Sequence, residues 1–347
     1  MSTTVPEQHF AAVIPQKGGP LAIVQRPTPT PGPKELLLEV KAVAFNPVDY
    51  YQRETGLFLE DYPAIVGSDV AGTVIRVGPD VRADAPQVGT RVTAFASAWM
   101  YKWNLDYGAM QQYVLVSEDN IAVLPEAFSF AEGSAFPMAA LVAWNGWLWA
   151  GIPQTPVLPG AAGVLVWGAA SSMGAFAVQA ARVMGYVVYA TASPRNHAYI
   201  KELGASHVFD YKAESVVSDI VAAAKADGTV IRAGFHAMGE QQLSVDVMGQ
   251  LRDGSEMVKL AIAPIVDEHL KVPVGVDTAF VQPPQDEEEI KERFRWIFGT
   301  WLQENLAAKK LVASPQVKVV EGGLESANKA LDEWKAGVSA IKLVIEL

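Results

Sequence analysis

Small residues fill the segment 167–174, which reads W-G-A-A-S-S-M-G and lies between a short apolar run and a predicted helix. A dinucleotide needs such a turn, because its pyrophosphate rests on backbone N–H groups at the helix start and a large side chain would hold it away. The G-x-G-x-x-G pattern is partly met, with Ala169, Ser171 and Gly174 at its glycine positions. The alternative is a glycine turn that only packs a helix on a sheet. The residues predicted to contact a cofactor are Gly168, Ala170, Ser171, Ser172, Met173 and Gly174.

The next strand end indicates which dinucleotide is bound. An NAD site usually carries a carboxylate about 20 residues past the last glycine. Here residues 191–196 read T-A-S-P-R-N, with no acid and with an arginine at a helix start. Such a stretch attracts a 2′-phosphate, so we predict NADPH over NAD, with Ser193, Arg195, Asn196 and Tyr211 around that phosphate. The alternative is that Arg195 is an ordinary solvated helix residue.

Tryptophans are the other unusual side chains, with nine in the chain. A large apolar pocket for an acyl chain or an aromatic substrate would use some of them, but packing in the core accounts for most. Trp144 and Trp147 are three residues apart, so one helix face could bury both. Trp99 and Trp103, in a long loop, are better candidates for a pocket.

Two kinds of element must position these residues. The first third is β-rich, with strands predicted at 36–44, 70–77 and from 91, and its turn clusters indicate a small barrel-like domain. From about residue 131 strands and helices alternate, which indicates βαβ units and a parallel, doubly wound sheet. Strands are predicted at 164–167, 187–191, 207–210 and 230–235, and helices at 175–184, 195–203, 215–225 and 287–308.

Composition excludes several classes of protein. The 347 residues suit about two domains, and 50% hydrophobic with 19% charged residues favours a buried core over disorder. Without cysteine there is no disulfide, no thiol nucleophile and no cysteine-bound zinc. A net charge of −11 disfavours nucleic acid as a partner. No secretory signal is recognised, and prolines and glycines interrupt the uncharged stretch 133–181, so we expect a cytoplasmic protein with no membrane anchor.

Several short motifs occur in a fixed order along the chain. Residues 46–51 read N-P-V-D-Y-Y and resemble N-P-x-D-x-[YK], and residues 62–74 resemble P-x-x-x-G-x-D-x-x-G-x-V. Residues 89–92, 108–113 and 322–325 also fit the medium-chain dehydrogenase/reductase superfamily, which the chain resembles from about residue 10 onward. The turn 167–174 and the ending 337–344 are most similar to fungal trans-acting enoyl reductases. Tyr51, where those enzymes often have lysine, is more similar to the quinone oxidoreductases.

The resemblance implies a fold and a set of site residues. It implies an α/β protein with a GroES-like irregular β-barrel catalytic domain at 1–132 and 310–347, and a Rossmann domain with a doubly wound parallel sheet at 133–309. A reduced nicotinamide would lie between the two. Tyr51 and Asn46 are the catalytic candidates: Tyr51 as proton donor, or else a packing residue beside Tyr50, and Asn46 near the nicotinamide. Asn46 and Asp49 are expected to brace their loop, and Lys342 of the ending is assigned to cofactor binding.

A zinc site is not expected. Zinc members of the superfamily use cysteine and a histidine followed by glutamate, and here the G-H-E position reads Gly67-Ser68-Asp69. A metal needs three or four ligands, whereas the five histidines are scattered. The chemistry then available is hydride delivery to an electrophile already activated by conjugation.

The predicted function is therefore NADPH-dependent, zinc-free reduction of an activated C=C bond in an enoyl thioester or enone. The alternatives are an NADPH:quinone oxidoreductase and an NADPH-binding sensor or structural protein with little turnover. The expected partner is a small-molecule or thioester substrate, either free or presented by an acyl carrier domain. Monomer and homodimer both stay open.

Overall fold

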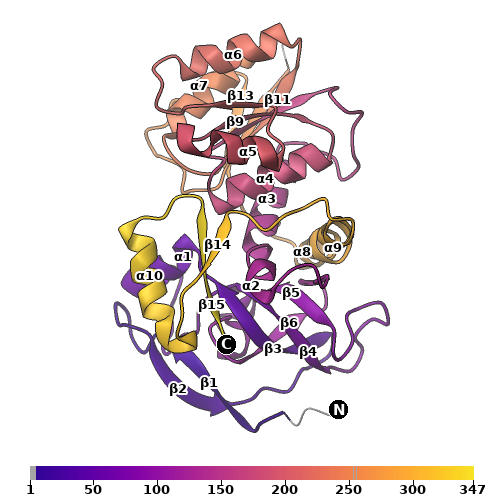
Figure 1. The fold of residues 1–347 in the computed structure, drawn as a ribbon, viewed down its shortest axis with the longest axis vertical. Coiled ribbons are helices and arrows are strands. Elements are labelled where there is room, and N and C mark those ends of the chain that lie inside the picture. The colour runs from indigo at the N-terminus through magenta and orange to yellow at the C-terminus, as the bar shows by residue number, and fades with distance from the viewer. Residues whose placement is uncertain (1–4, 253, 255) are drawn as a thin grey trace. The chain divides into compact units, whose positions relative to one another are not determined.

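The computed structural model describes residues 5–252, 254 and 256–347 (Figure 1). The chain divides into two compact units. Unit 1 comprises Met1–Met138 and Asp286–Leu347, and unit 2 comprises Ala139–Gln285. The predicted fold class is confirmed: one unit holds a mostly antiparallel sheet and the other a parallel one.

Unit 1 is built on a seven-stranded sheet in the order β14-β15-β3-β4-β5-β7, with β6 paired to β3. Among the described strands of this sheet, β14 and β15 alone pair in parallel, and a separate hairpin is formed by β1 and β2. The strands are β1 (Gln8–Val13), β2 (Ala22–Pro27), β3 (Glu35–Ala44), β4 (Asp69–Val77), β5 (Arg91–Phe95), β6 (Tyr113–Ser117), β7 (Ile121–Val123), β14 (Gln316–Val319) and β15 (Ile341–Glu346). The helical elements are α1 (Pro47–Thr55), η1 (Ala98–Tyr101), η2 (Leu105–Tyr107), α2 (Phe130–Gly133), α8 (Glu287–Phe294), the π-helical η4 (Arg295–Leu302), α9 (Gln303–Ala307), η5 (Gly323–Ser326) and α10 (Ala327–Ala336).

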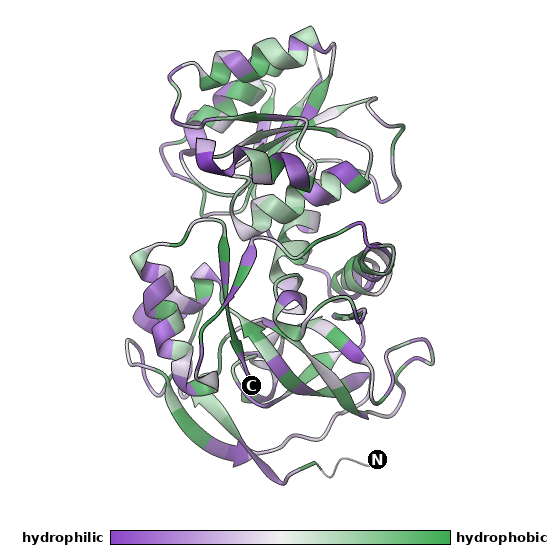
Figure 2. Ribbon diagram, viewed as in Figure 1, coloured by the Kyte–Doolittle hydropathy of each residue, from purple (hydrophilic) through white to green (hydrophobic). Residues whose placement is uncertain are grey.

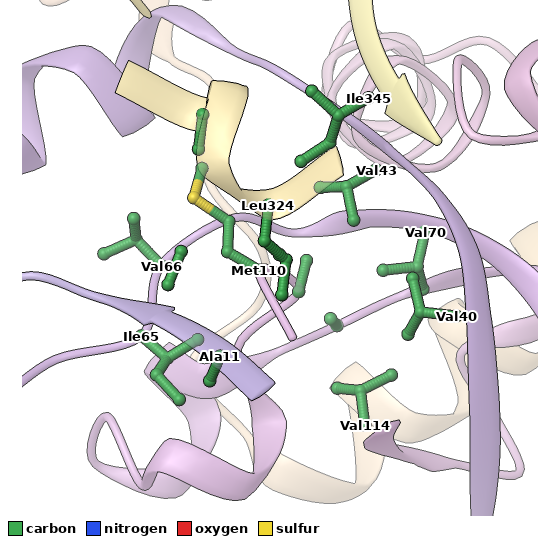
Figure 3. Packing of buried hydrophobic residues seen from close by; sticks show 14 of the residues in the cluster. Ala11, Val40, Val43, Ile65, Val66, Val70, Met110, Val114, Leu324 and Ile345 are labelled. Atoms are coloured by element: carbon green, nitrogen blue, oxygen red, sulfur yellow. The ribbon is translucent and has the colours of Figure 1, made fainter. Parts of the chain in front are cut away.

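Both ends of the chain contribute to the core of unit 1. Figure 3 shows Leu324 of η5 and Ile345 of β15 in the same cluster as Val43, Val70 and Met110. The β-branched residues on the inward faces of β3 and β4 suit a pleated, buried surface. The C-terminal segment is therefore an integral part of this unit, and it brings β15 beside β3.

Helix α10 is amphipathic. It buries Ala327, Ala330 and Leu331, at the spacing that places side chains on one helix face. Figure 2 shows its remaining residues as mainly hydrophilic. The buried face lets α10 pack beside α1, which carries one of the predicted catalytic residues.

The helical segment α8–α9 groups with unit 1. Phe294 and Phe298 lie against Phe95 of β5, with ring centroids 6.1 Å and 6.4 Å apart. The sequence prediction placed residues 286–309 in the dinucleotide-binding domain instead. This difference arises because amphipathicity predicts a helix but does not identify the sheet that its apolar face covers. The functional roles assigned to the two domains stay predictions.

Unit 2 is a six-stranded, wholly parallel sheet in the order β10-β9-β8-β11-β12-β13. Chain order reverses at β8, because β9 lies on one side of it and β11 on the other. Open parallel sheets bind ligands beyond the strand ends at such a point. The strands are β8 (Gly163–Trp167), β9 (Val187–Thr191), β10 (His207–Phe209), β11 (Ile231–His236), β12 (Val258–Ile262) and β13 (Val276–Phe280). The helical elements are α4 (Ser172–Val183), η3 (Pro194–Asn196), α5 (His197–Leu203), α6 (Val216–Ala226) and α7 (Gln241–Leu251).

Helix α3 (Pro137–Trp149) has no charged residue. It buries Trp144 and Trp147 almost completely, at 0% and 1% exposure, which confirms that one helix face takes both. Within the described part of the chain, no helix combines the length and the apolar character that crossing a membrane requires.

Candidate functional site

The turn after β8 is closed by one hydroxyl group. Ser171 is the N-cap of α4, and its Oγ accepts a hydrogen bond from the backbone N–H of Gly174 at 3.1 Å. The same Oγ donates to the carbonyl oxygen of Gly168 at 2.9 Å, since a hydroxyl can do both at once. This short side chain therefore caps the helix and fixes the turn, where a longer one would fill the space in front of the helix.

The glycines of the turn are required by its backbone geometry. Gly168 has φ +79°, and a Cβ there would lie 2.7 Å from Cγ of Met238. A Cβ on Gly174 would lie 2.4 Å from the carbonyl oxygen of Gly168. The strand and helix thus approach as closely as their backbones allow, which leaves the helix start open to a ligand.

The first turn of α4 fits a phosphate-bearing cofactor. Helix starts leave backbone N–H groups without an intrahelical acceptor and carry partial positive charge. At this start the Oγ of Ser172 is buried and has no hydrogen-bond partner among the described residues. A pyrophosphate oxygen is the acceptor that these donors lack. Ala170 and Met173 flank the same turn, half-buried.

The residues predicted around a 2′-phosphate follow neighbouring strands. Ser193, Arg195 and Asn196 come directly after β9, and Tyr211 comes after β10, its parallel neighbour. Parallel strands end at the same sheet edge, so the structure brings these residues to one edge. The Nδ2 of Asn196 donates to the Oγ of Ser193 at 3.2 Å, and the Arg195 side chain is exposed.

Sequence reasoning missed one cation at this edge. Lys212 follows Tyr211, and its Nζ lies 5.8 Å from the centre of the Tyr211 ring. The nearby carboxylate of Asp210 accepts the backbone N–H of Lys212 at 3.0 Å, so it closes a local turn. The signal that could have found Lys212 is its place one residue past the predicted strand end.

Unit 1 holds a ring of three buried polar side chains. Lys342 Nζ lies 2.6 Å from Asn46 Oδ1 and 2.9 Å from Asp69 Oδ2. Asn46 Nδ2 reaches the same Asp69 oxygen at 2.9 Å. The other Asp69 oxygen accepts the backbone N–H of Met138 at 2.6 Å. The neighbouring strands β15, β3 and β4 bring the three together, since Asn46 follows β3, Asp69 opens β4 and Lys342 lies in β15.

The structure thus places Lys342 inside this ring, with 3% of its surface exposed. Sequence reasoning assigned Lys342 to the cofactor and gave Asp69 no role. A signal was present for both: Asp69 is the only charged residue in the motif 62–74, and Lys342 interrupts an apolar strand. A lone charge in an apolar run requires a buried partner.

Asp49 braces the start of α1 from inside the protein. Its Oδ2 accepts the backbone N–H of Asn46 at 2.7 Å, and its Oδ1 is buried with no hydrogen-bond partner among the described residues. Burial raises the pKa of Asp49 to about 7, and the charge of Asp69 adds to the rise. The Asn46 N–H and the Lys342 ammonium act in the opposite direction but do not offset it.

Tyr51 lies on α1 with 45% of its surface exposed. Its ring makes edge contacts with Tyr50 and with Trp334 of α10, at centroid distances of 5.4 Å and 6.0 Å. The ring is thus held by aromatic neighbours on two helices. Its role as a proton donor stays a prediction.

The two pocket candidates in the 98–103 loop differ in surroundings. Trp103 packs against a small cluster that includes Leu37, Tyr107 and Leu115. Trp99 is 36% exposed. Lys102 and Trp103 both have left-handed backbone, with φ of 53° and 58°, a conformation that non-glycine residues rarely adopt.

Comparison with known proteins settles the family. Residues 32–126 match the family described as alcohol dehydrogenase GroES-like domain, and residues 172–278 match the family described as zinc-binding dehydrogenase. The chain is 42% identical over 346 residues to the trans-enoyl reductase tndF of Aspergillus flavipes, covering 98% of this chain and 99% of that one. The chain belongs to the medium-chain dehydrogenase/reductase superfamily.

Two more similarities agree with this assignment. The trans-enoyl reductase tazE of Aspergillus terreus is 43% identical, over 81% of this chain and 94% of that protein. A crystal structure of an alcohol dehydrogenase superfamily protein from Novosphingobium aromaticivorans has the same fold, with a TM-score of 0.79 at 24% identity over 98% and 99% of the two chains. This medium-chain reductase is thus an oxidoreductase that binds a nicotinamide cofactor.

The zinc named by the second family description does not fit the residues of this reductase. Among the described residues, no three histidine, cysteine, aspartate or glutamate side chains gather in a way that could hold a metal. Both oxygens of Asp69, at the position of the superfamily's glutamate, already accept hydrogen bonds from Lys342, Asn46 and Met138. The described side chains around Asp69 therefore do not form a zinc ligand set.

The turn makes a first prediction. Gly174→Ala places a methyl group against the Gly168 carbonyl, so the helix start must shift, and we expect affinity for the nicotinamide dinucleotide to fall at least about tenfold. Fluorescence titration with NADPH and NADH measures this. Gly299→Ala is the matched control: apart from its chain neighbours and the backbone of its own helix, no atom lies within 4 Å of the added methyl group, so it should bind normally. Unchanged affinity in Gly174→Ala would show that the turn does not bind the cofactor.

Asp49 makes a second prediction. The folded pKa of Asp49, about 7, lies above the unfolded value, so its stabilising contribution is complete below about pH 4 and is lost as the pH rises to about 7. Urea unfolding between about pH 5 and pH 8 should show the free energy of unfolding of wild type falling relative to Asp49→Asn, by about 2 to 3 kcal/mol. Asp61→Asn, an exposed change, should follow wild type. Parallel curves for Asp49→Asn and wild type would contradict a raised pKa.

Proposed function

We propose that this medium-chain reductase uses NADPH to reduce an activated carbon–carbon double bond, in an α,β-unsaturated thioester or an enone, without a metal ion. The observation that carries the proposal is the similarity, along 98% of the chain, to a protein named a trans-enoyl reductase. The engaged oxygens of Asp69 support the absence of a metal from the reaction. A conjugated electrophile needs no Lewis acid, which makes the substrate class consistent with this site.

The first task of the protein is to bind and orient the cofactor. The N–H groups and the Ser172 hydroxyl at the start of α4 bind the pyrophosphate. Arg195, with Ser193, Asn196 and Tyr211, binds the 2′-phosphate, because a guanidinium pairs with phosphate where a carboxylate would repel it. When bound, the reduced nicotinamide supplies a hydride.

The second task is to supply a proton. In the proposed reaction the β-carbon of the substrate gains the hydride, the two electrons of the double bond move toward the carbonyl, and the α-carbon then gains a proton. Tyr51 donates that proton from its phenol hydroxyl. The helix contacts of its ring limit the directions in which the hydroxyl can point.

A substrate screen that follows the absorbance of NADPH tests the proposal. Oxidation of NADPH with the N-acetylcysteamine thioester of trans-2-octenoic acid, or with an enone, is the expected result. Turnover with quinones alone would show that the protein is a quinone reductase and not an enoyl reductase. Tight NADPH binding without turnover of any of these would indicate a sensor or structural protein.

Arg195→Ala tests the choice of NADPH. Loss of one charge-assisted contact to the 2′-phosphate should raise the Michaelis constant for NADPH about tenfold and leave that for NADH nearly unchanged. Steady-state kinetics with both cofactors measure the ratio. Lys201→Ala removes an exposed cation from α5 and should change neither constant. Equal effects of Arg195→Ala on both Michaelis constants would show that Arg195 does not bind the 2′-phosphate.

Tyr51→Phe tests the proton donor. Removing the hydroxyl keeps the ring and its contacts, so kcat should fall about a hundredfold while NADPH affinity stays at the wild-type value. Stopped-flow turnover and cofactor titration measure the two quantities. Tyr50→Phe, on the same helix, should turn over normally. If Tyr51→Phe keeps the wild-type kcat, Tyr51 is a packing residue.

A further inference from the structure

The hydrogen bonds around Asn46 fix which end of its carboxamide is oxygen. An ammonium only donates, so the atom 2.6 Å from Lys342 Nζ must be the amide oxygen. An ionised carboxylate only accepts, so the atom 2.9 Å from Asp69 Oδ2 must be the amide nitrogen. In the flipped amide, the nitrogen of Asn46 would face the Lys342 ammonium and its oxygen would face the Asp69 carboxylate. Lys342 and Asp69 together therefore exclude that orientation.

The ring also determines which N–H is used. Lys342 Nζ bridges Asn46 Oδ1 and the same Asp69 oxygen that Nδ2 reaches. A ring of this kind closes only through the amide N–H that is cis to the amide oxygen. The other N–H, which is cis to Cβ, has no acceptor among the described residues. Asn46 is thus a donor with one hydrogen committed and one available.

Asn46 is 5% exposed, Lys342 3% and Asp69 0%. The Lys342 ammonium already donates to two oxygens of the ring, whereas Asn46 keeps one N–H outside it. A ligand at this place would therefore contact Asn46. A buried ion pair is costly to desolvate and is seldom the most stabilising choice for a core, so its use here calls for a role beyond stability.

We propose that Lys342 and Asp69 are positioning residues, which hold the Asn46 carboxamide in one orientation so that its remaining N–H donates to a carbonyl oxygen of the bound reactants. The inference rests on the proposed function, because that carbonyl belongs either to the substrate or to the carboxamide group of the nicotinamide. A donor aimed at the substrate carbonyl would stabilise the negative charge that develops there as the β-carbon is reduced. Lys342 then acts through Asn46, not as a direct ligand of the cofactor.

The orientation can be tested without turnover. In protein labelled with ¹⁵N-asparagine, the Asn46 side-chain signals are assigned by their loss in Asn46→Ala. We expect two widely separated proton signals with slow solvent exchange in wild type. They should move to ordinary asparagine values in Lys342→Met/Asp69→Asn, which removes both charges together and so leaves no unpaired buried ion. Ordinary signals in wild type would overturn the proposal.

Ligand additions in the same experiment identify the carbonyl. A shift of one of the two Asn46 proton signals on adding NADP⁺ alone assigns the N–H to the nicotinamide carboxamide. A shift that appears only after the N-acetylcysteamine thioester of octanoic acid is added to that complex assigns it to the substrate carbonyl. No shift with either probe would overturn the donor role.

Kinetics test whether the orientation matters for the reaction. With NADPH and the octenoyl thioester, Lys342→Met/Asp69→Asn should lose at least about tenfold in kcat and keep its NADPH dissociation constant within about twofold. Lys342→Arg keeps the cation and should recover part of kcat. Lys318→Met, in the neighbouring strand β14, removes an exposed lysine paired with Glu333 and should behave as wild type.

The outcomes separate this inference from the proposed function. If NADPH affinity falls more than about tenfold in the double variant while kcat is kept, Lys342 is a cofactor ligand and the proposal fails. If the double variant keeps both values, orientation of Asn46 has no catalytic effect and the proposal fails. If wild type turns over no thioester or enone, the proposed function fails, and the Asn46 signals and their response to NADP⁺ still decide the orientation and the donor role.

Discussion

A buried ammonium needs hydrogen-bond acceptors and a counter-charge inside the protein, and in unit 1 residues on or beside three neighbouring strands supply both. The acceptors of Lys342 are Asp69 and Asn46, which lie on or beside two neighbouring strands of the sheet. Leaving either charge unpaired would cost several kcal/mol, so strand register and side-chain orientation are coupled here. The same Asp69 carboxylate also holds the backbone N–H of Met138, at the start of α3.

A second constraint governs unit 2, and it is steric. The turn between β8 and α4 brings two backbone segments so close that Gly168 and Gly174 admit no side chain. Ser171 closes this turn with its hydroxyl, and the reversal of strand order at β8 leaves the ends of the neighbouring strands around it. In the proposed function, nucleotide binding depends on these backbone groups, and the choice of NADPH depends on exposed side chains such as Arg195.

Local features of the fold could be predicted from the sequence. Residues 187–191 form the predicted strand, and Trp144 and Trp147 share a buried helix face. The ring around Lys342 could not be predicted in the same way, because Lys342 and Asp69 are 273 residues apart in sequence. The partner of α8–α9 was also missed, since an apolar helix face fits any complementary sheet. The raised pKa of Asp49 required the burial of its carboxyl, which only the packed structure shows.

The central claim is that hydride passes from NADPH to the β-carbon of a conjugated carbonyl substrate with no metal ion taking part. Its most direct test is the product formed from the octenoyl thioester and NADPH deuterated at both C4 positions, with protein treated with a chelator. Mass spectrometry and NMR of the product should show one deuterium, on the β-carbon. The rate with the deuterated NADPH should be the same for chelator-treated and untreated protein. A product without deuterium, or a reaction that stops with the chelator and resumes on adding zinc, would contradict the account.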